Sequence, residues 1–150
     1  MNNLISLKKI SKNYILNNKV KALKNINFNF ELGKIYSIVG PSGSGKSTLL
    51  NILSLIDKPT SGNIKIDGKL IDFNNHDLND KIRASSIGII YQNYNLLPDF
   101  TALENVSLAS LALNKNTKTS LNEARKTISN LGLSKRLDHF PSELSGGENQ

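Results

Sequence analysis

One segment, GPSGSGKST at residues 40–48, constrains the fold of this chain more than any other. It matches the pattern G-x-x-x-x-G-K-S/T. The specified positions are held by Gly40, Gly45, Lys46 and Ser47. Glycines let the backbone turn so that successive N–H groups point inward, and no Cβ blocks the approach of a ligand. Because the apolar run KIYSIV precedes the segment and helical spacing follows it, the sequence predicts a strand, an anion-binding loop and a helix in that order.

A polyphosphate is the ligand that suits such a loop. The helix beginning near Lys46 adds the positive end of its dipole. We expect Lys46 to reach the β- and γ-phosphates of a nucleoside triphosphate, the Ser47 hydroxyl to bind Mg²⁺, and Thr48 to lie near the α-phosphate. The other loop residues that we assign to nucleotide binding are Gly40, Pro41, Ser42, Gly43, Ser44 and Gly45. The alternative, a Gly/Ser linker that ends in a helix, is disfavoured by the complete motif and its flanks.

Composition places the chain in a broad class. Its 150 residues suffice for one domain with a core, and 38% hydrophobic with 21% charged residues is typical of a soluble globular protein. No apolar run approaches the roughly 18 residues of a membrane span, and the N-terminus is too polar for a secretory signal. The lysines behind the net charge of +7 are scattered. We therefore expect a cytosolic protein whose charge is solvated surface, with no nucleic-acid partner.

Alternation and apolar runs predict the strands. LISLKKI at 4–10 and NINFNF at 25–30 suit an antiparallel sheet with one wet face, and NIKIDG at 63–68 predicts a strand and a turn. The denser runs at 34–39 and 86–92 indicate strands buried on both faces.

Helical spacing follows the glycine loop and returns in the last third of the chain. Leu49, Ile52, Leu53 and Ile56 predict a helix that DKPTSG, 57–62, breaks. TALENVSLASLAL at 101–113 opens with a capping box, Thr101 with Glu104. SLNEARKTISNLGL at 120–133 opens with a second box, Ser120 with Glu123, and Gly132 stops it. Its apolar face is predicted to consist of Leu121, Ala124, Ile128 and Leu131.

Three further features narrow the chemistry, although each alone has an ordinary explanation. Gln92 ends the run at 86–92 and is suited to touch Mg²⁺ and an attacking water, but a surface glutamine is commoner there. ELSGGE at 143–148 indicates a backbone anion nest at a helix start, or a simple turn. Tyr14 is placed to stack on adenine, or is a strand-end aromatic residue.

Taken together and in this order, these features resemble the ATP-binding subunit of ABC transporters. The resemblance implies an α/β fold of the P-loop NTPase type, with an antiparallel β-subdomain, a partial parallel core sheet and an α-helical subdomain. We expect residues 1–92 to form the β-rich ATP-binding core and 95–145 the helical subdomain, with the signature at 144–148. The implied ligands are ATP and Mg²⁺, the metal ion being held by Ser47 and Gln92.

The resemblance also implies partners. Two such domains face each other head to tail, and the signature of one closes the ATP site of the other. The signature residues are Leu144, Ser145, Gly146, Gly147 and Glu148. The helical subdomain is expected to contact integral membrane permease subunits, which implies a peripheral location at the cytoplasmic face of a bacterial inner membrane. DKPTSG, YQNYNLLPDFTALENV and HFPSELSGGE resemble the subfamily for lipoprotein release and macrolide or peptide export, with the cell-division ATPase as a cousin. The stretch LLPDFTALENV fits lipoprotein release best.

The chain departs from the family after the signature. Family members continue with an apolar strand ending in Asp-Glu, an Asp loop and a switch histidine, and none lies within 1–150. His76 and His139 do not follow a buried strand, and Glu148 belongs to the signature. We expect a fragment of a full ATPase that lacks the C-terminal part of the core. A decayed gene product and a short ATP-binding decoy stay open.

Rival classes fit less well. A soluble P-loop enzyme such as a small kinase needs a substrate lid and has no use for LSGGE. A DNA-repair ATPase with this signature would carry a long coiled coil before it, whereas only about 100 residues separate Gly45 from Ser145. Translation-factor relatives carry two such domains, and the local match to exporter-type sequences argues against them.

The first prediction concerns turnover. The chain of residues 1–150 is expected to hydrolyse ATP negligibly, because no residue within it takes the place of the glutamate that polarises the attacking water. The measurement is phosphate release by the purified chain with Mg²⁺. Robust turnover that Lys46→Ala abolishes would contradict this expectation.

Overall fold

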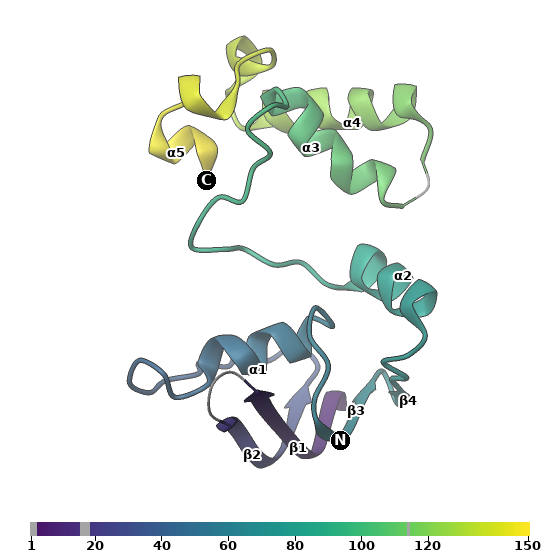
Figure 1. Ribbon diagram of the computed structural model, residues 1–150. Coiled ribbons are helices and arrows are strands. Elements are labelled where there is room, and N and C mark those ends of the chain that lie inside the picture. Colours follow the sequence, from purple (N-terminus) through teal and green to yellow (C-terminus); the bar gives the residue numbers. More distant parts are fainter. Residues whose placement is uncertain (1–2, 16–18, 114) are drawn as a thin grey trace. The chain divides into compact units, whose positions relative to one another are not determined.

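The computed structural model describes residues 3–15, 19–113 and 115–150 (Figure 1). The chain divides into two compact units, residues 1–83 and 84–150. The boundary between 92 and 95 that the sequence suggests stays a prediction.

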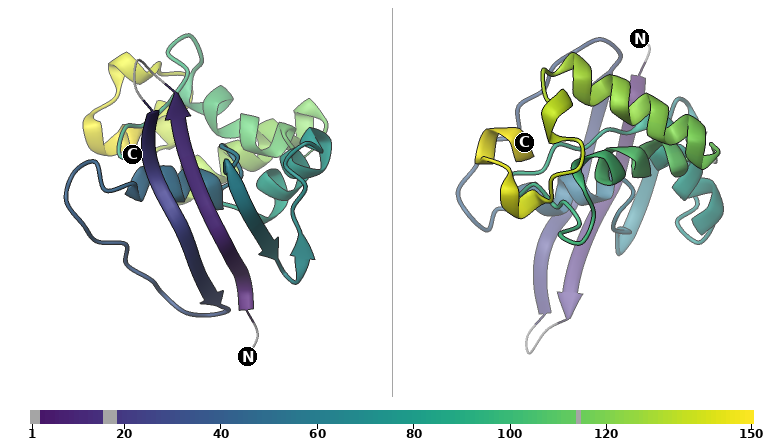
Figure 2. Two further views of the ribbon diagram at one scale, coloured as in Figure 1. Left: turned by 60° about the horizontal axis from the view of Figure 1, so that its bottom comes forward. Right: turned by 90° about the horizontal axis from the view of Figure 1, so that it is seen from above.

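The first unit is built on a four-stranded sheet in the order β2-β1-β3-β4, antiparallel throughout (Figures 1 and 2). The strands are β1 (Asn3–Ile15), β2 (Lys19–Glu31), β3 (Ser61–Ile66) and β4 (Lys69–Leu70). Leu7 of β1 lies opposite Phe28 of β2 and opposite Ile64 of β3. The strands predicted at 4–10, 25–30 and 63–68 are confirmed, and the first two are longer than predicted.

The core of the first unit lies between the sheet and α1 (Lys46–Leu53), which crosses one face of it (Figures 1 and 2). Its buried apolar side chains are Leu7, Ile10, Leu23, Ile52, Leu55, Ile64 and Ile71. Leu7 and Ile10 are three residues apart, so strict alternation would send them to opposite faces. A bulge brings both to the core, because the register shifts between them and Lys9 takes a φ of 53°. The Lys9 N–H donates to the Asn27 side chain at 2.9 Å.

Two predictions of strands are wrong. Residues 34–39 and 86–92 form no strand among the described residues. Ile35 is fully exposed and Ile90 is 90% exposed. A strand buried on both faces needs neighbours that accept its backbone hydrogen bonds and cover its apolar side chains. Neither segment pairs with a strand in the part of the chain that the structure describes, so the apolar pattern is present without the structure that it indicates.

The helix α2 (His76–Ser86) was not foreseen from the sequence. It is polar along most of its length, and Asn79 is its buried residue. The signal was a capping residue, because the Asn75 side chain accepts the N–H of Leu78 at 3.1 Å.

The second unit holds α3 (Ala102–Leu111) and α4 (Thr117–Asn130) side by side (Figure 1). Buried Leu103, Ala124 and Ile128 form its core, against which partly buried apolar side chains pack: Ala102, Leu121, Leu133 and Leu137. Three short helices follow: η1 (Ser134–Arg136), η2 (Pro141–Glu143) and α5 (Gly146–Asn149). None of the helices in the described residues is long and apolar enough to cross a membrane.

The helix starts of this unit give one confirmation and one correction. The capping box of Thr101 with Glu104 is present, with the Thr101 N–H donating to the carboxylate at 2.8 Å. The box predicted for Ser120 with Glu123 is wrong, because α4 begins earlier and Asn116 caps it, accepting the Thr119 N–H at 2.8 Å. Ser120 is buried within the helix.

The end of α4 shows a second difference. Gly132 has a φ of 77° and stops the helix as predicted. Leu131, assigned to the apolar face, is 71% exposed. It lies at the helix end, where the chain departs from helical geometry and the spacing no longer places its side chain on the core face.

The sheet core generates a stability prediction. Ile64→Ala is expected to lower the free energy of unfolding by about 2–5 kcal/mol, because it empties a fully buried site. The same change at Ile15, which is 87% exposed, is expected to alter it by about 0.5 kcal/mol or less. Urea denaturation followed by circular dichroism measures both, and equal losses would contradict the assigned core.

Candidate nucleotide-binding site

The glycine loop of residues 40–48 ends in a close contact with the sheet. Gly45 precedes α1 with a φ of 91°, in the left-handed region. A Cβ at this position would lie 2.5 Å from the Ala22 carbonyl oxygen and 3.0 Å from a methyl carbon of Leu23. Glycine is therefore required twice, by the backbone conformation and by the approach to β2.

The Lys46 side chain folds back across this loop. Its Nζ donates to the carbonyl oxygens of Gly40 and Pro41 at 2.8 and 2.7 Å. Within residues 3–15, 19–113 and 115–150, no carboxylate forms an ion pair with this ammonium. The positive charge is thus held at the loop by neutral groups, and an anion there would be its first charged partner.

The start of α1 offers further groups for an anion. The first helical hydrogen bond runs from the Leu49 N–H to the Gly45 carbonyl at 2.9 Å, so earlier N–H groups have no partner within the helix. No side chain caps this end, because its capping position is Gly45. Ser47 is exposed in the first turn. Its hydroxyl oxygen is a hard ligand of the kind that Mg²⁺ prefers, so the residues present fit the predicted metal ion.

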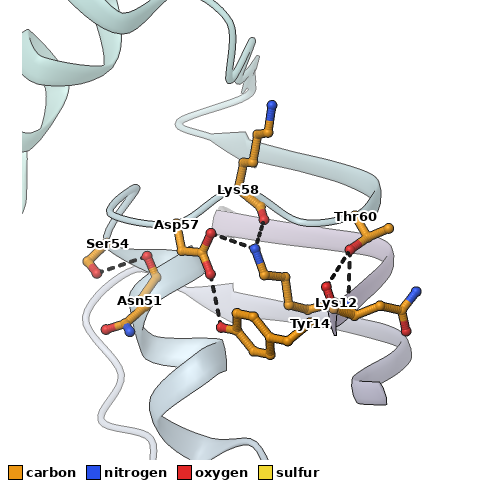
Figure 3. A network of polar contacts seen from close by, with 8 residues as sticks. Lys12, Tyr14, Asn51, Ser54, Asp57, Lys58 and Thr60 are labelled. Atoms are coloured by element: carbon orange, nitrogen blue, oxygen red, sulfur yellow. Dashed lines mark hydrogen bonds and ion pairs between the residues drawn. The ribbon is translucent and has the colours of Figure 1, made fainter. Parts of the chain in front are cut away.

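Tyr14, the predicted adenine-stacking residue, belongs to a polar network at the end of β1 (Figure 3). Its hydroxyl donates to Asp57 Oδ2 at 3.0 Å. Lys12 Nζ donates to Asp57 Oδ1 at 2.6 Å and to the Lys58 carbonyl at 2.8 Å, and it lies 4.9 Å from the centroid of the Tyr14 ring. Burial raises the pKa of Asp57, but the hydrogen bonds from Lys12 and Tyr14 outweigh it and hold the pKa below its usual value. No role was predicted for Asp57 itself from the sequence of residues 57–62.

Gln92 lies exposed in the segment between α2 and α3. That segment is ordered farther along by Asn105 of α3. The Asn105 side chain accepts the Leu97 N–H at 2.9 Å and donates to the Phe100 carbonyl at 2.9 Å. The assignment of Gln92 to Mg²⁺ and water stays a prediction.

The signature segment starts a helix, which is one of the two structures that its pattern left open. Ser145 caps the one-turn helix α5 and forms a reciprocal capping box with Glu148. The Glu148 N–H donates to Ser145 Oγ at 3.3 Å, and the Ser145 N–H donates to Glu148 Oε2 at 2.8 Å. The Asn149 side chain donates to the Leu144 carbonyl at 3.2 Å, which ties the end of the turn to its start.

Glu148 also has a charged partner that the sequence analysis did not identify. Arg136 Nε donates to Glu148 Oε1 at 2.7 Å. This bond, together with the Ser145 N–H, lowers the pKa of Glu148 to about 2. The carboxylate is ionised in all but strongly acidic solution, so the capping box and the ion pair persist together.

Comparison with known proteins agrees with these features. The family model described as ABC transporter matches residues 23–150, and the chain belongs to this family. It is 43% identical over 150 residues to the lipoprotein-releasing system ATP-binding protein LolD of Rickettsia bellii, covering 99% of this chain and 66% of that protein. It is also similar to the solved dimeric structure of MJ0796, a bacterial ABC transporter cassette, with 39% identity, a TM-score of 0.84 and coverage of 97% of this chain and 65% of that one.

A second solved structure of MJ0796, a post-hydrolysis dimer bound to ADP and Pi, is 38% identical with a TM-score of 0.84 and covers 97% of this chain and 65% of that one. These similarities confirm the predicted fold of an ABC ATPase cassette. The partial parallel core sheet is not formed by the described residues, whose sheet is antiparallel throughout. The chain spans about two thirds of the length of the curated relative. The roles assigned above to individual residues stay predictions.

The geometry of the signature predicts a titration. Glu148 is expected to titrate with a pKa of about 2, and Arg136→Ala is expected to raise that pKa toward the ordinary 4.5. Since the pKa is lowered on folding, the stabilisation by this carboxylate is present above pH 4.5 and is lost as the pH falls toward 2.

Carboxyl-resolved NMR titration measures this pKa. Arg125→Ala, at an exposed position of α4, is the matched control and is expected to leave the pKa of Glu148 unchanged. An unshifted value in the unaltered chain would show that the ion pair does not form.

Proposed function

We propose that this chain is an ATP-binding part of an ABC transporter whose ATP binding and hydrolysis drive the release of lipoproteins from a bacterial inner membrane. The observation that carries the ATP-binding proposal is the glycine loop with the Lys46 ammonium held on the carbonyl oxygens of Gly40 and Pro41. The similarity to LolD supports the assignment of the cargo.

Binding of ATP would replace the carbonyl partners of the Lys46 ammonium by phosphate oxygens. Phosphate oxygens carry more negative charge than the carbonyls of Gly40 and Pro41, so Lys46 would turn to them and form charge-assisted hydrogen bonds. The N–H groups of the loop and of the first turn of α1 would hold the same anion. Ser47 and Gln92 would hold Mg²⁺, which neutralises phosphate charge, and Tyr14 would stack on adenine.

We propose that the signature acts on ATP bound by a second copy or a related domain, in a head-to-tail dimer. The dimeric structures of MJ0796 support this assembly. Ser145 Oγ accepts the N–H of Glu148, which leaves its hydroxyl proton to donate to a phosphate oxygen of the partner's ATP. Integral membrane permease subunits would be the other partners, at the cytoplasmic face of the inner membrane.

The experiment is Mg-ATP binding by isothermal titration calorimetry. Lys46→Ala is expected to weaken ATP binding by about tenfold or more, because it removes charge-assisted hydrogen bonds to the phosphates. Lys126→Ala, an exposed lysine of α4, removes the same charge elsewhere and is expected to change nothing. Equal affinities of the Lys46→Ala variant and the parent chain would overturn the proposal.

A further inference from the structure

Asp57 lies at the centre of the network that surrounds Tyr14. The phosphate-binding role proposed for residues 40–48 does not explain why a carboxylate is placed there. We infer that Asp57 is a positioning residue of the nucleotide site, which fixes the Tyr14 ring as a platform for adenine while leaving phosphate binding to the loop. This inference rests on the proposed function, because it concerns the same nucleotide.

The Asp57 carboxylate serves two partners at once (Figure 3). One oxygen accepts the Tyr14 hydroxyl at 3.0 Å, and the other accepts the Lys12 ammonium at 2.6 Å. The Lys12 side chain is only 12% exposed, so this ion pair is shielded from solvent more than a surface pair would be. Tyr14 is therefore held at its outer end as well as at its backbone.

The same contacts determine which face of the Tyr14 ring a base would use. The Lys12 ammonium lies over the Tyr14 ring, 4.9 Å from its centroid, in a cation–π arrangement. A base would stack on the opposite face. Since the hydroxyl bond to Asp57 restricts rotation of the ring, less conformational freedom is lost when a base stacks on it.

Asp57 is itself held by the end of α1. Its N–H donates to the Asn51 carbonyl at 3.1 Å, and the Ile56 N–H donates to the same oxygen at 2.9 Å. The other end of this helix carries Gly45, which approaches Leu23 of β2. Leu23 lies opposite Lys12 in the sheet. The tyrosine end of β1 and the phosphate loop are thus attached to the same helix and the same strand pair.

The end of β1 has other anchors that do not involve Asp57. The Asn13 N–H donates to Thr60 Oγ1 at 2.9 Å, and the Thr60 N–H donates to the Ser11 carbonyl at 2.8 Å. Removing the Asp57 carboxylate therefore leaves the backbone of β1 attached. The change is expected to act on the orientation of the Tyr14 side chain.

The test compares two ligands that share their phosphates. Calorimetry with Mg-ATP and with Mg-tripolyphosphate, which has no base, is carried out on the parent chain and on Asp57→Ala. We expect ATP binding to weaken about three- to tenfold and tripolyphosphate binding to stay unchanged. Asp80→Ala removes a carboxylate from an exposed ion pair with Arg83 and is the matched control, with both affinities unchanged.

A second variant keeps the test valid if Asp57→Ala does not fold. Tyr14→Phe retains the ring and removes only the hydroxyl that Asp57 accepts, so it is expected to weaken ATP binding similarly and tripolyphosphate binding not at all. Because both changes break the hydrogen bond between Tyr14 and Asp57, their effects are not expected to add. The double variant is expected to bind ATP no more weakly than the single variant with the lower ATP affinity.

The outcomes separate this inference from the proposed function. Unchanged ATP affinity in both single variants would overturn the role of Asp57 while leaving ATP binding intact. Equal weakening of ATP and tripolyphosphate would also overturn it, since the network would then act on the phosphate loop. Failure of the parent chain to bind either ligand would overturn the proposed function and this inference with it.

Discussion

The approach of Gly45 to β2 is the contact on which the rest of the site depends. A carbonyl oxygen of the sheet lies only 2.5 Å from the point where any other residue would place its Cβ, so the first turn of α1 packs directly on the strand. That seating fixes where the helix begins and hence where its N–H groups and the Lys46 ammonium are. It leaves the helix without a capping side chain. An anion can accept hydrogen bonds from the free N–H groups at such a helix start. The loop therefore combines close packing with N–H groups that have no partner within the helix.

The glycine loop and the signature treat the free N–H groups of a helix start in opposite ways. At α1 the capping position is a glycine, and the N–H groups stay open to a ligand. At α5 the capping position is Ser145, and Glu148 completes a capping box within the chain. The Arg136 ion pair then keeps Glu148 ionised. The first helix start leaves N–H groups open to an anion, whereas the second is a closed turn with the one hydroxyl group of Ser145. The role proposed for Ser145, toward a nucleotide that another chain holds, needs only that hydroxyl group.

Local patterns predicted the local structure of this chain well. The loop, the antiparallel strands and the Thr101 cap depend on residues near one another in sequence, so motif and period carried enough information. Ser120 was misassigned because two candidate caps lie four residues apart, and Asn116 precedes it. Lys12 and Asp57 were missed because their contact joins residues 45 apart, and no short pattern marks such a pair. Side-chain networks of this kind become visible only once the fold brings their members together.

The apolar segments 34–39 and 86–92 mark the limit of pattern reasoning most clearly. Their composition is that of strands buried on both faces, and yet Ile35 and Ile90 lie exposed. A helix or a hairpin satisfies its own backbone, but a parallel strand depends on neighbours distant in sequence. Exposed runs of this kind expose apolar area and unpaired backbone groups, both of which favour association with another strand. The apolar pattern therefore shows that each segment needs neighbouring strands. Whether those neighbours are present depends on residues outside the segment.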